Sequence, residues 1–169
     1  ATVGGNICLA LSASTFAPVM VALQAKYEIW RAEGDPYFID AVDFQSAPQQ
    51  TLLKPGEVLR RFEISAENLA QWQTRFKRMA VCTAGYAIAI IVTAYHPQTQ
   101  RVRFGIGGSV VAPCLIEFDT LPTYEQIGAA LQGKSFLEDE RGSAAYRQHI
   151  TQVLMQRGLT ELTTEIVGA

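Results

Sequence analysis

Two adjacent glycines near the start of the chain, Gly4 and Gly5, constrain the fold more than any other short stretch. Without side chains, this piece of backbone can turn several N–H groups to one side and approach an anion such as a diphosphate closely. Thr2 and Asn6 bracket the pair with a hydroxyl and a carboxamide, which can donate to phosphate oxygens. The stretch is either an anion-binding loop or an ordinary tight turn, and the pair alone fits both.

A helix is predicted directly after this loop. Ser14 can cap its N-terminus, and the apolar residues Phe16, Val19, Met20 and Leu23 recur at helical spacing. A helix N-terminus beside the two glycines would add a dipole that favours an anion. The alternative is a helix that only fills the core, and the spacing fits that equally well.

The rest of the chain predicts an α+β fold. Alternating apolar residues and turn signals indicate strands, and Pro55-Gly56 is typical of a type II turn. Gly105, Gly107 and Gly108 indicate a bulge or another backbone packed close by. The predicted strands cover residues 26–31, 37–42, 58–64, 75–81, 87–95 and 101–111, and the predicted helices cover residues 67–73, 123–131 and 143–158.

Composition excludes several classes of function. The 169 residues are 49% hydrophobic and 18% charged, which is typical of a globular protein with one medium domain or two small ones. A formal net charge of -2 argues against a nucleic-acid partner. Residues 1–25 carry no charge, but polar residues interrupt the stretch and no basic segment precedes it, so neither a membrane span nor a signal peptide is predicted.

The cysteines predict no metal site. Cys8, Cys82 and Cys114 lie far apart, without the paired spacing of zinc and iron–sulfur ligands or of a disulfide framework. We expect buried or free thiols that bind no metal. A reducing, cytoplasmic location is then the default expectation.

No pattern for nucleophilic, metal or acid–base catalysis occurs in the sequence, so no catalytic residue is predicted. His96 stands in a loop and is expected to be solvated, as is the acidic run Glu138-Asp139-Glu140. His149 is expected to face the core or a partner, because it falls on the stripe predicted for the last helix. That stripe consists of Tyr146, His149, Ile150, Val153, Leu154 and Arg157.

Six short motifs follow one another along nearly the whole chain. They are Thr2-Val3-Gly4-Gly5-Asn6, Lys54-Pro55-Gly56-Glu57-Val58-Leu59, Arg75-Phe76-Lys77, Ala87-Ile88-Ala89, Gly107-Gly108-Ser109-Val110-Val111-Ala112-Pro113 and Arg141-Gly142-Ser143-Ala144-Ala145-Tyr146-Arg147. This succession resembles the FAD-binding medium subunit of the molybdenum hydroxylases, the family of carbon monoxide dehydrogenase and xanthine dehydrogenase. Tyr86 stands where many relatives carry an aspartate, so no role is transferred to it.

The resemblance implies a set of FAD-binding residues. Five of them would hold the diphosphate: Thr2, Val3, Gly4, Gly5 and Asn6. Thr15 would lie near the start of the following helix, and Leu59 and Lys77 would lie toward the flavin. In the family a second glycine-rich loop holds the other side of the diphosphate, and this sequence has no counterpart of it. With an initial Ala in place of Met, the chain is expected to be a processed chain or a fragment that binds FAD weakly and is inactive alone.

The resemblance also implies partners and a domain organisation. Molybdopterin is expected on a large subunit and two-iron two-sulfur clusters on a small one, while FAD on this subunit passes electrons to an acceptor. Residues 1–65 would be the second part of a two-lobed FAD-binding domain. Residues 66–169 would form a small α+β sandwich domain with helices on one face of a sheet, as in the C-terminal domain of the carbon monoxide dehydrogenase flavoprotein.

A rival hypothesis comes from a different class of function. A chain without the upstream phosphate loop could bind no flavin and serve only as a docking or scaffold module. Colour distinguishes the two, because a flavoprotein is yellow and a docking module is colourless.

Overall fold

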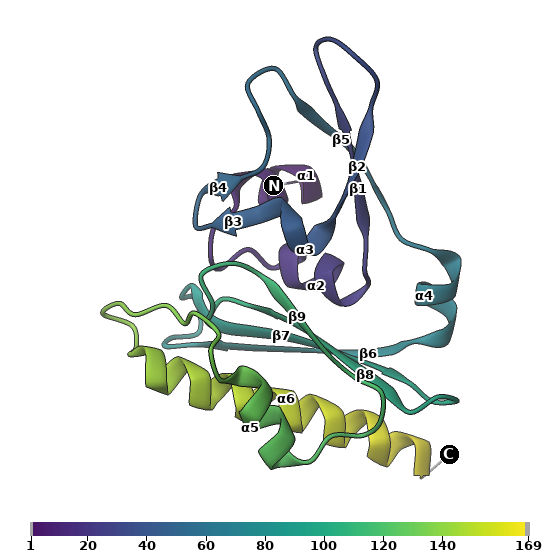
Figure 1. Cartoon of the computed structure of the whole chain (residues 1–169). Coiled ribbons are helices and arrows are strands. Elements are labelled where there is room, and N and C mark those ends of the chain that lie inside the picture. Colours follow the sequence, from purple (N-terminus) through teal and green to yellow (C-terminus); the bar gives the residue numbers. More distant parts are fainter. Residues whose placement is uncertain (1, 168–169) are drawn as a thin grey trace.

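The computed structural model describes residues 2–167, which form three layers (Figure 1). The middle layer is an antiparallel sheet with strand order β6-β7-β8-β9. Its strands are β6 (Gln73–Ala80), β7 (Ala87–His96), β8 (Arg101–Gly107) and β9 (Cys114–Phe118). The α+β class predicted from the sequence is confirmed. The last strand was wrongly predicted as one element, because residues 101–111 contain β8 and then a turn at Gly108.

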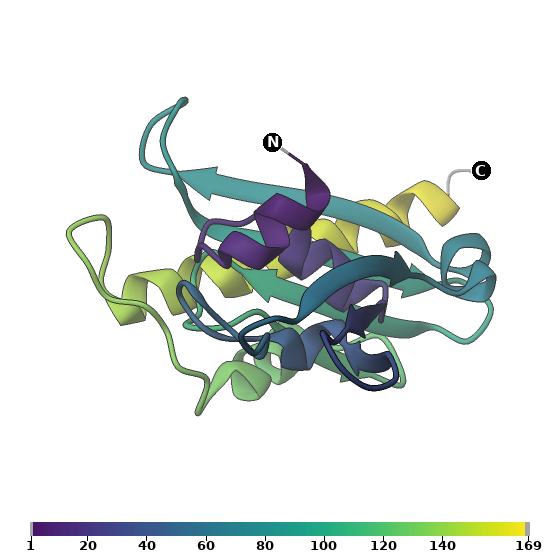
Figure 2. The ribbon, with the colours of Figure 1, turned by 90° about the horizontal axis from the view of Figure 1, so that it is seen from above.

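The lower layer consists of α5 (Tyr124–Leu131) and α6 (Ala144–Val167). Thr123 caps α5 in a capping box, as the sequence predicted. Ser143 accepts a hydrogen bond from the Tyr146 N–H at the start of α6. Seen from above, α6 runs diagonally beneath the sheet (Figure 2).

The upper layer holds the N-terminal part of the chain. It contains α1 (Val3–Leu9), α2 (Phe16–Ala22), α3 (Ala41–Phe44), a three-stranded sheet and a short hairpin. The sheet has the order β2-β1-β5, with β1 (Lys26–Trp30), β2 (Tyr37–Asp40) and β5 (Val58–Glu63), and the hairpin pairs β3 (Gln45–Ala47) with β4 (Gln50–Thr51). The linker helix α4 (Ala66–Gln71) connects this layer to β6.

Directly paired residues show which face of the main sheet each side chain occupies. Phe76, Val92, Gly105 and Leu115 form one cross-strand row, and the row beginning at Lys77 points to the opposite face. A Cβ built on Gly105 would lie 2.1 Å from the carbonyl oxygen of Pro18 in α2. The first row therefore faces α2, and the close backbone packing predicted at the glycines is confirmed.

Helices cover both faces of the main sheet. The sequence predicted helices on one face, and α5 and α6 do lie together on one face. The opposite face is covered by α2, which belongs to the N-terminal part of the chain and contacts β8 through its small residues Pro18 and Ala22. A helix can lie this close because Gly105 places no side chain between the two backbones.

The last helix differs from its predicted length and orientation. It continues past Gly158 to Val167, and its buried face carries Arg147, Thr151, Leu154, Met155, Leu159 and Leu162. Ile150 and Leu154 of the predicted stripe do pack toward the core, but His149 and Arg157 are exposed, so the prediction holds only in part. Gly158 does not end the helix. It brings α6 against the sheet, since a Cβ there would lie 2.4 Å from the Thr93 hydroxyl oxygen.

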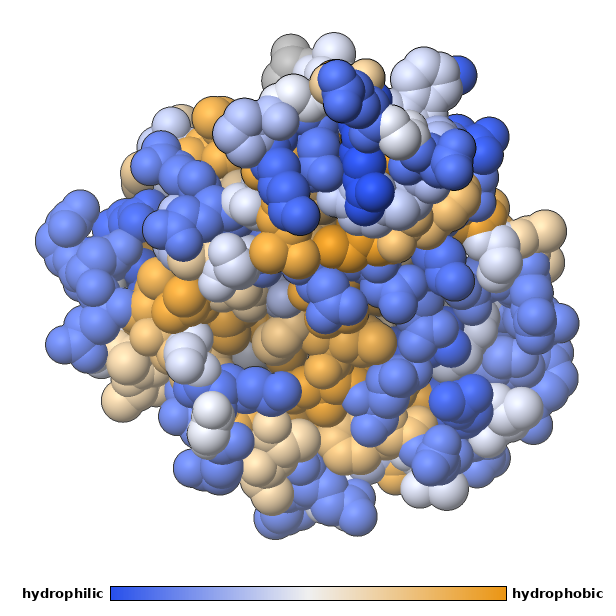
Figure 3. Space-filling model, turned by 45° about the horizontal axis from the view of Figure 1, so that its top comes forward, coloured by the Kyte–Doolittle hydropathy of each residue, from blue (hydrophilic) through white to orange (hydrophobic). Residues whose placement is uncertain are grey.

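The layers do not close completely on every side. Apolar residues gather in a hollow between the polar upper part and the polar lower rim (Figure 3). One open pocket of about 410 Å³ between the layers is lined by Val21 of α2, Ala41 and Val42 of α3, Asn68 of α4 and Leu115 of β9. Among the helices described, none is long and apolar enough to cross a membrane.

Candidate functional site

The two glycines at the start of the chain lie in the first turn of α1. Thr2 is the N-cap residue, and its hydroxyl oxygen accepts a hydrogen bond from the Gly5 N–H at 3.0 Å. The predicted Gly-Gly loop was therefore wrong in its conformation. Neither glycine has a positive φ, so the pair is not needed for a left-handed turn.

Gly4 leaves the N-terminal end of α1 open. A Cβ built on Gly4 would meet no atom within 4 Å, whereas a Cβ on Gly5 would lie 3.1 Å from the Thr2 hydroxyl oxygen. The N–H groups of Val3 and Gly4 have no intrahelical acceptor, because they belong to the first turn of a helix. The position beside Gly4 is therefore uncrowded, and the N–H groups of Val3 and Gly4 lie in the same first turn.

Asn6 joins α1 to α2. Its side-chain Oδ1 accepts a hydrogen bond from the Phe16 N–H at 3.2 Å, and its main-chain oxygen accepts one from the Ser14 hydroxyl at 2.9 Å. The predicted cap by Ser14 was wrong, since Asn6 supplies the acceptor for the first turn of α2. The Nδ2 group of Asn6 can still donate to a ligand.

The structure brings seven of the eight predicted cofactor-binding residues to the upper layer. Thr15 directly precedes α2, next to the Asn6 contact. Val3 and Leu59 pack against the same core cluster, which is built on Ile7, Tyr27 and Phe44. Leu59 lies in β5, and α1 packs beside this strand.

Lys77 is not brought to this group. Register places its side chain on the face of the main sheet that α6 covers, opposite α2. Its Nζ donates to both carboxylate oxygens of Glu161 in α6. The neighbouring Phe76 points to the α2 face instead and is 44% exposed. Side chains alternate between the two faces of β6. Once the face covered by α6 is known, this alternation places Phe76 on the α2 face.

The Lys54-Pro55-Gly56-Glu57 motif forms a structural turn. Gly56 has φ +82°, as the predicted type II turn requires. The Glu57 carboxylate accepts hydrogen bonds from the Lys54 N–H at 2.9 Å and the Tyr37 hydroxyl at 3.0 Å. The backbone hydrogen bond from Lys54 is the main cause of the lowered pKa of Glu57. This motif fastens the loop before β5 to β2.

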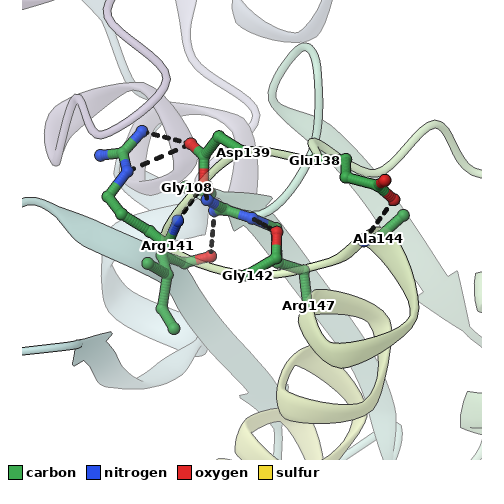
Figure 4. Close-up of polar contacts among 8 residues, drawn as sticks. Gly108, Glu138, Asp139, Arg141, Gly142, Ala144 and Arg147 are labelled. Atoms are coloured by element: carbon green, nitrogen blue, oxygen red, sulfur yellow. Dashed lines mark hydrogen bonds and ion pairs between the residues drawn. The ribbon is translucent and has the colours of Figure 1, made fainter.

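The last of the six motifs surrounds a buried arginine (Figure 4). Arg147 is only 1% exposed and donates to the carbonyl oxygens of Ile88 and Gly108, each at 3.0 Å, and to Asp139 Oδ1 at 2.6 Å. Arg141 also binds Asp139, at 2.5 Å. The acidic run was predicted to be solvated, which holds for Glu138 and Glu140 but is wrong for Asp139, because Asp139 compensates a buried cation.

Burial and several hydrogen bonds act in opposite directions on the pKa of Asp139. Partial burial alone would raise the pKa of its carboxyl group, but the bonds from Arg141 and Arg147 outweigh burial and lower the pKa to about 2. This carboxylate is therefore ionised at any pH near neutrality. Its role is structural, since both cations that it binds belong to its own chain segment.

The described part of the chain contains no group of three or more His, Cys, Asp and Glu residues that could hold a metal ion. Cys8 lies in α1, Cys82 in the turn after β6 and Cys114 in β9. Burial raises the pKa of the Cys114 thiol, which disfavours a thiolate ligand. His96 binds the Gln71 side chain at the linker helix.

Comparison with known proteins identifies one sequence family. Residues 1–66 match the family described as the FAD binding domain in molybdopterin dehydrogenase. No curated protein matches the chain in sequence.

Several solved structures share the fold. Carbon monoxide dehydrogenase from Oligotropha carboxidovorans has a TM-score of 0.80 and 19% identity over 94% of this chain and 59% of that chain. The corresponding enzyme from Hydrogenophaga pseudoflava has a TM-score of 0.76 and 18% identity over 95% and 60%. Quinoline 2-oxidoreductase from Pseudomonas putida 86 has a TM-score of 0.71 and 23% identity over 95% and 61%. The chain thus spans about three fifths of these relatives, and the likeness concerns the fold.

Proposed function

Because residues 1–66 belong to the FAD-binding domain family of the molybdopterin dehydrogenases, we propose that this chain is the FAD-binding part of an oxidoreductase subunit. The bound FAD would supply the redox chemistry, accepting electrons and passing them to an acceptor. The chain's own residues would bind and orient the cofactor. The fold shared with two carbon monoxide dehydrogenases and a quinoline oxidoreductase supports this proposal.

The observation that carries the proposal is the open N-terminal end of α1. The N–H groups of Val3 and Gly4 would donate to the diphosphate, and Gly4 leaves room for it because no atom lies within 4 Å of its Cβ position. Thr2 uses its oxygen as the acceptor for Gly5, so its hydroxyl proton remains able to donate outward. Asn6 would add its Nδ2 group.

The neutral surroundings of this segment are compatible with an anion. Residues 1–25 contain no acidic side chain that would repel a diphosphate. The N-terminal partial charge of α1 and its N–H groups would provide the attraction without a lysine.

We propose that Thr15 and Leu59 border the cofactor, since Thr15 adjoins the Asn6 contact and Leu59 shares an apolar cluster with Val3. On the face of the main sheet that carries α2, we assign the contact with FAD to Phe76. The Lys77 side chain is bound to Glu161 on the opposite face, whereas the half-exposed ring of Phe76 lies on the face that carries α2.

The metal centres of such an enzyme would lie on partner subunits. The described residues of this chain offer no metal-binding cluster, and the similar carbon monoxide dehydrogenase from Hydrogenophaga pseudoflava is an enzyme of the molybdenum cofactor, solved in a form that lacks the Mo-pyranopterin moiety. We propose that a molybdopterin-binding subunit and an iron–sulfur subunit deliver electrons to the FAD of this one.

A titration followed by flavin fluorescence tests the proposal. FAD is expected to bind the chain saturably and at least about 10-fold more tightly than riboflavin, which lacks the diphosphate, because one charge-assisted hydrogen bond contributes about this factor. Gly4→Val should remove the difference between the two ligands without lowering the melting temperature. Equal binding of FAD and riboflavin, or no effect of Gly4→Val, would contradict the proposed site. No binding at all would favour the docking module.

A further inference from the structure

A polar network centred on Arg103 joins the upper layer to the main sheet at the C-terminal end of α2. Arg103 is 6% exposed, and its guanidinium carbon lies 3.8 Å from the centroid of the Trp72 ring. Its Nε donates to Glu117 Oε1 at 2.9 Å, and its NH1 group donates to Asn68 Oδ1 at 3.1 Å. Partners from β9, α4 and the residue that follows α4 thus fix this buried cation in one orientation.

Two side-chain amides extend the network to α2. Asn68 Nδ2 donates to the main-chain oxygen of Leu23, the C-cap residue of α2, at 3.0 Å. Gln24 Nε2 donates to Glu117 Oε1 at 3.1 Å. The C-terminal end of α2 is therefore tied to the same two side chains that hold Arg103.

The other end of α2 is tied to α1. The Phe16 N–H donates to Asn6 Oδ1, and between the two ends the backbone of α2 rests directly on Gly105. A helix of seven residues is about 10 Å long and does not compress along its axis. A shift of α2 at Leu23 would therefore reach the Phe16 N–H, which is bonded to Asn6 of α1.

We propose that Arg103 is a positioning residue for the FAD site, an inference that rests on the proposed function. Arg103 fixes Asn68 and Glu117, these side chains fix the C-terminal end of α2, and α2 holds α1 through the bond between Phe16 and Asn6. A lysine cannot replace it, because an ammonium group lacks the planar fork that stacks on Trp72 while binding two oxygens.

Amide hydrogen exchange tests this chain of contacts without any cofactor. Arg103→Met is expected to accelerate exchange about 10-fold at Phe16 and across α1, since both depend on the position of α2. Arg103→Lys should restore only part of the protection. Arg101→Met is the matched control on the same strand, because Arg101 is half-buried and its ion pair is with the exposed Asp119. Asn68→Ala removes the link to Leu23 and one acceptor of Arg103 but leaves Glu117 and Trp72 in contact with Arg103, so it should give the same pattern with a smaller amplitude.

Leu131→Ala is the control for a general loss of stability, because it removes a buried contact of α5 beneath the sheet. At an equal loss of melting temperature, Leu131→Ala should leave exchange at Phe16 and α1 unchanged. The inference is overturned if Arg103→Met leaves that exchange unchanged, or if Leu131→Ala raises it equally.

Titration with FAD adds a second readout. Arg103→Met should weaken FAD binding about 10-fold, and Arg101→Met should not. If the unaltered chain binds no FAD, the proposed function fails, while the exchange experiment still decides whether Arg103 fixes α1.

Discussion

Asp139 and Arg147 show how one residue pair governs a whole loop. Arg147 is buried at the start of α6 and takes two backbone oxygens of the sheet as partners, and Asp139 supplies its only carboxylate among the described contacts. Removing the carboxylate would leave a buried cation without charge compensation, which strongly destabilises a fold. The pair therefore anchors the loop between α5 and α6 against the main sheet.

Lowering the pH should reveal how far the stability of the fold depends on the Asp139 carboxylate. The pKa of Asp139 is lowered from 3.8 to about 2, so its stabilisation is complete above pH 4 and is lost as the pH falls from about 4 to 2. The loss amounts to about 2 kcal/mol, since one pKa unit corresponds to about 1.4 kcal/mol. Urea unfolding of Asp139→Asn should show a deficit in stability at pH 5 that closes by pH 2. Glu140→Gln is the control, and a deficit independent of pH would contradict the assignment.

The contacts of single residues were harder to predict from the sequence than the elements or the fold. The sequence identified Thr2, Gly4, Gly5 and Asn6 as one group, and the structure keeps them together at the start of α1. It could not show that Asn6 caps α2, because this contact joins residues ten positions apart. The face of Lys77 depends on strand register, which only the tertiary packing fixes.

At Gly158 the close packing of α6 against β7 restricts which side chain the helix can carry. Alanine normally stabilises a helix interior by about 1 kcal/mol relative to glycine. At Gly158 the added Cβ would lie 2.4 Å from Thr93 Oγ1, in the buried contact between α6 and β7. Gly158→Ala should therefore destabilise the chain by about 1–3 kcal/mol in thermal or urea unfolding, the usual range for overpacking a core.

Gly128 in α5 provides the matched control for this prediction. Its added Cβ would meet only the end of the Gln152 side chain, which can move. Gly128→Ala should be neutral or stabilising, and Thr93→Ala should rescue part of the Gly158→Ala loss. Equal effects of alanine at both glycines would show that α6 does not depend on a close approach.

Periodicity predicted the existence of most elements better than their ends and faces. The strands β1, β2, β5, β6, β7 and β8 and the helices α4, α5 and α6 were expected near their observed positions, whereas β9 was missed. The face of α6 was predicted only in part: Ile150 and Leu154 do pack toward the core, but Arg147 and Thr151, two polar residues, also point inward and find buried partners. A helix was missed at Val3–Leu9 because two glycines argue for a turn, whereas the Thr2 cap stabilises helix there.

At the scale of the whole molecule, most of the shared motifs prove to be structural. The Lys54–Glu57 turn, the close-packed glycines of β8 and the loop around Arg147 hold the layers together through contacts within the chain. The Thr2–Asn6 segment differs, because a Cβ at Gly4 would meet no atom within 4 Å. The motifs thus predicted the fold of the chain better than the ligand contacts, since Lys77 of the third motif was also expected to lie toward the flavin but is bound to Glu161.

The amide NMR spectrum of the isotope-labelled chain, recorded while FAD is added, tests the central claim most directly. If the first turn of α1 binds the diphosphate, the largest saturable shifts should occur at Val3, Gly4, Gly5 and Asn6, and inorganic pyrophosphate should shift the same amides. Smaller shifts are expected at Phe76. Shifts that avoid residues 3–6, or that occur with riboflavin as strongly as with FAD, would contradict the account.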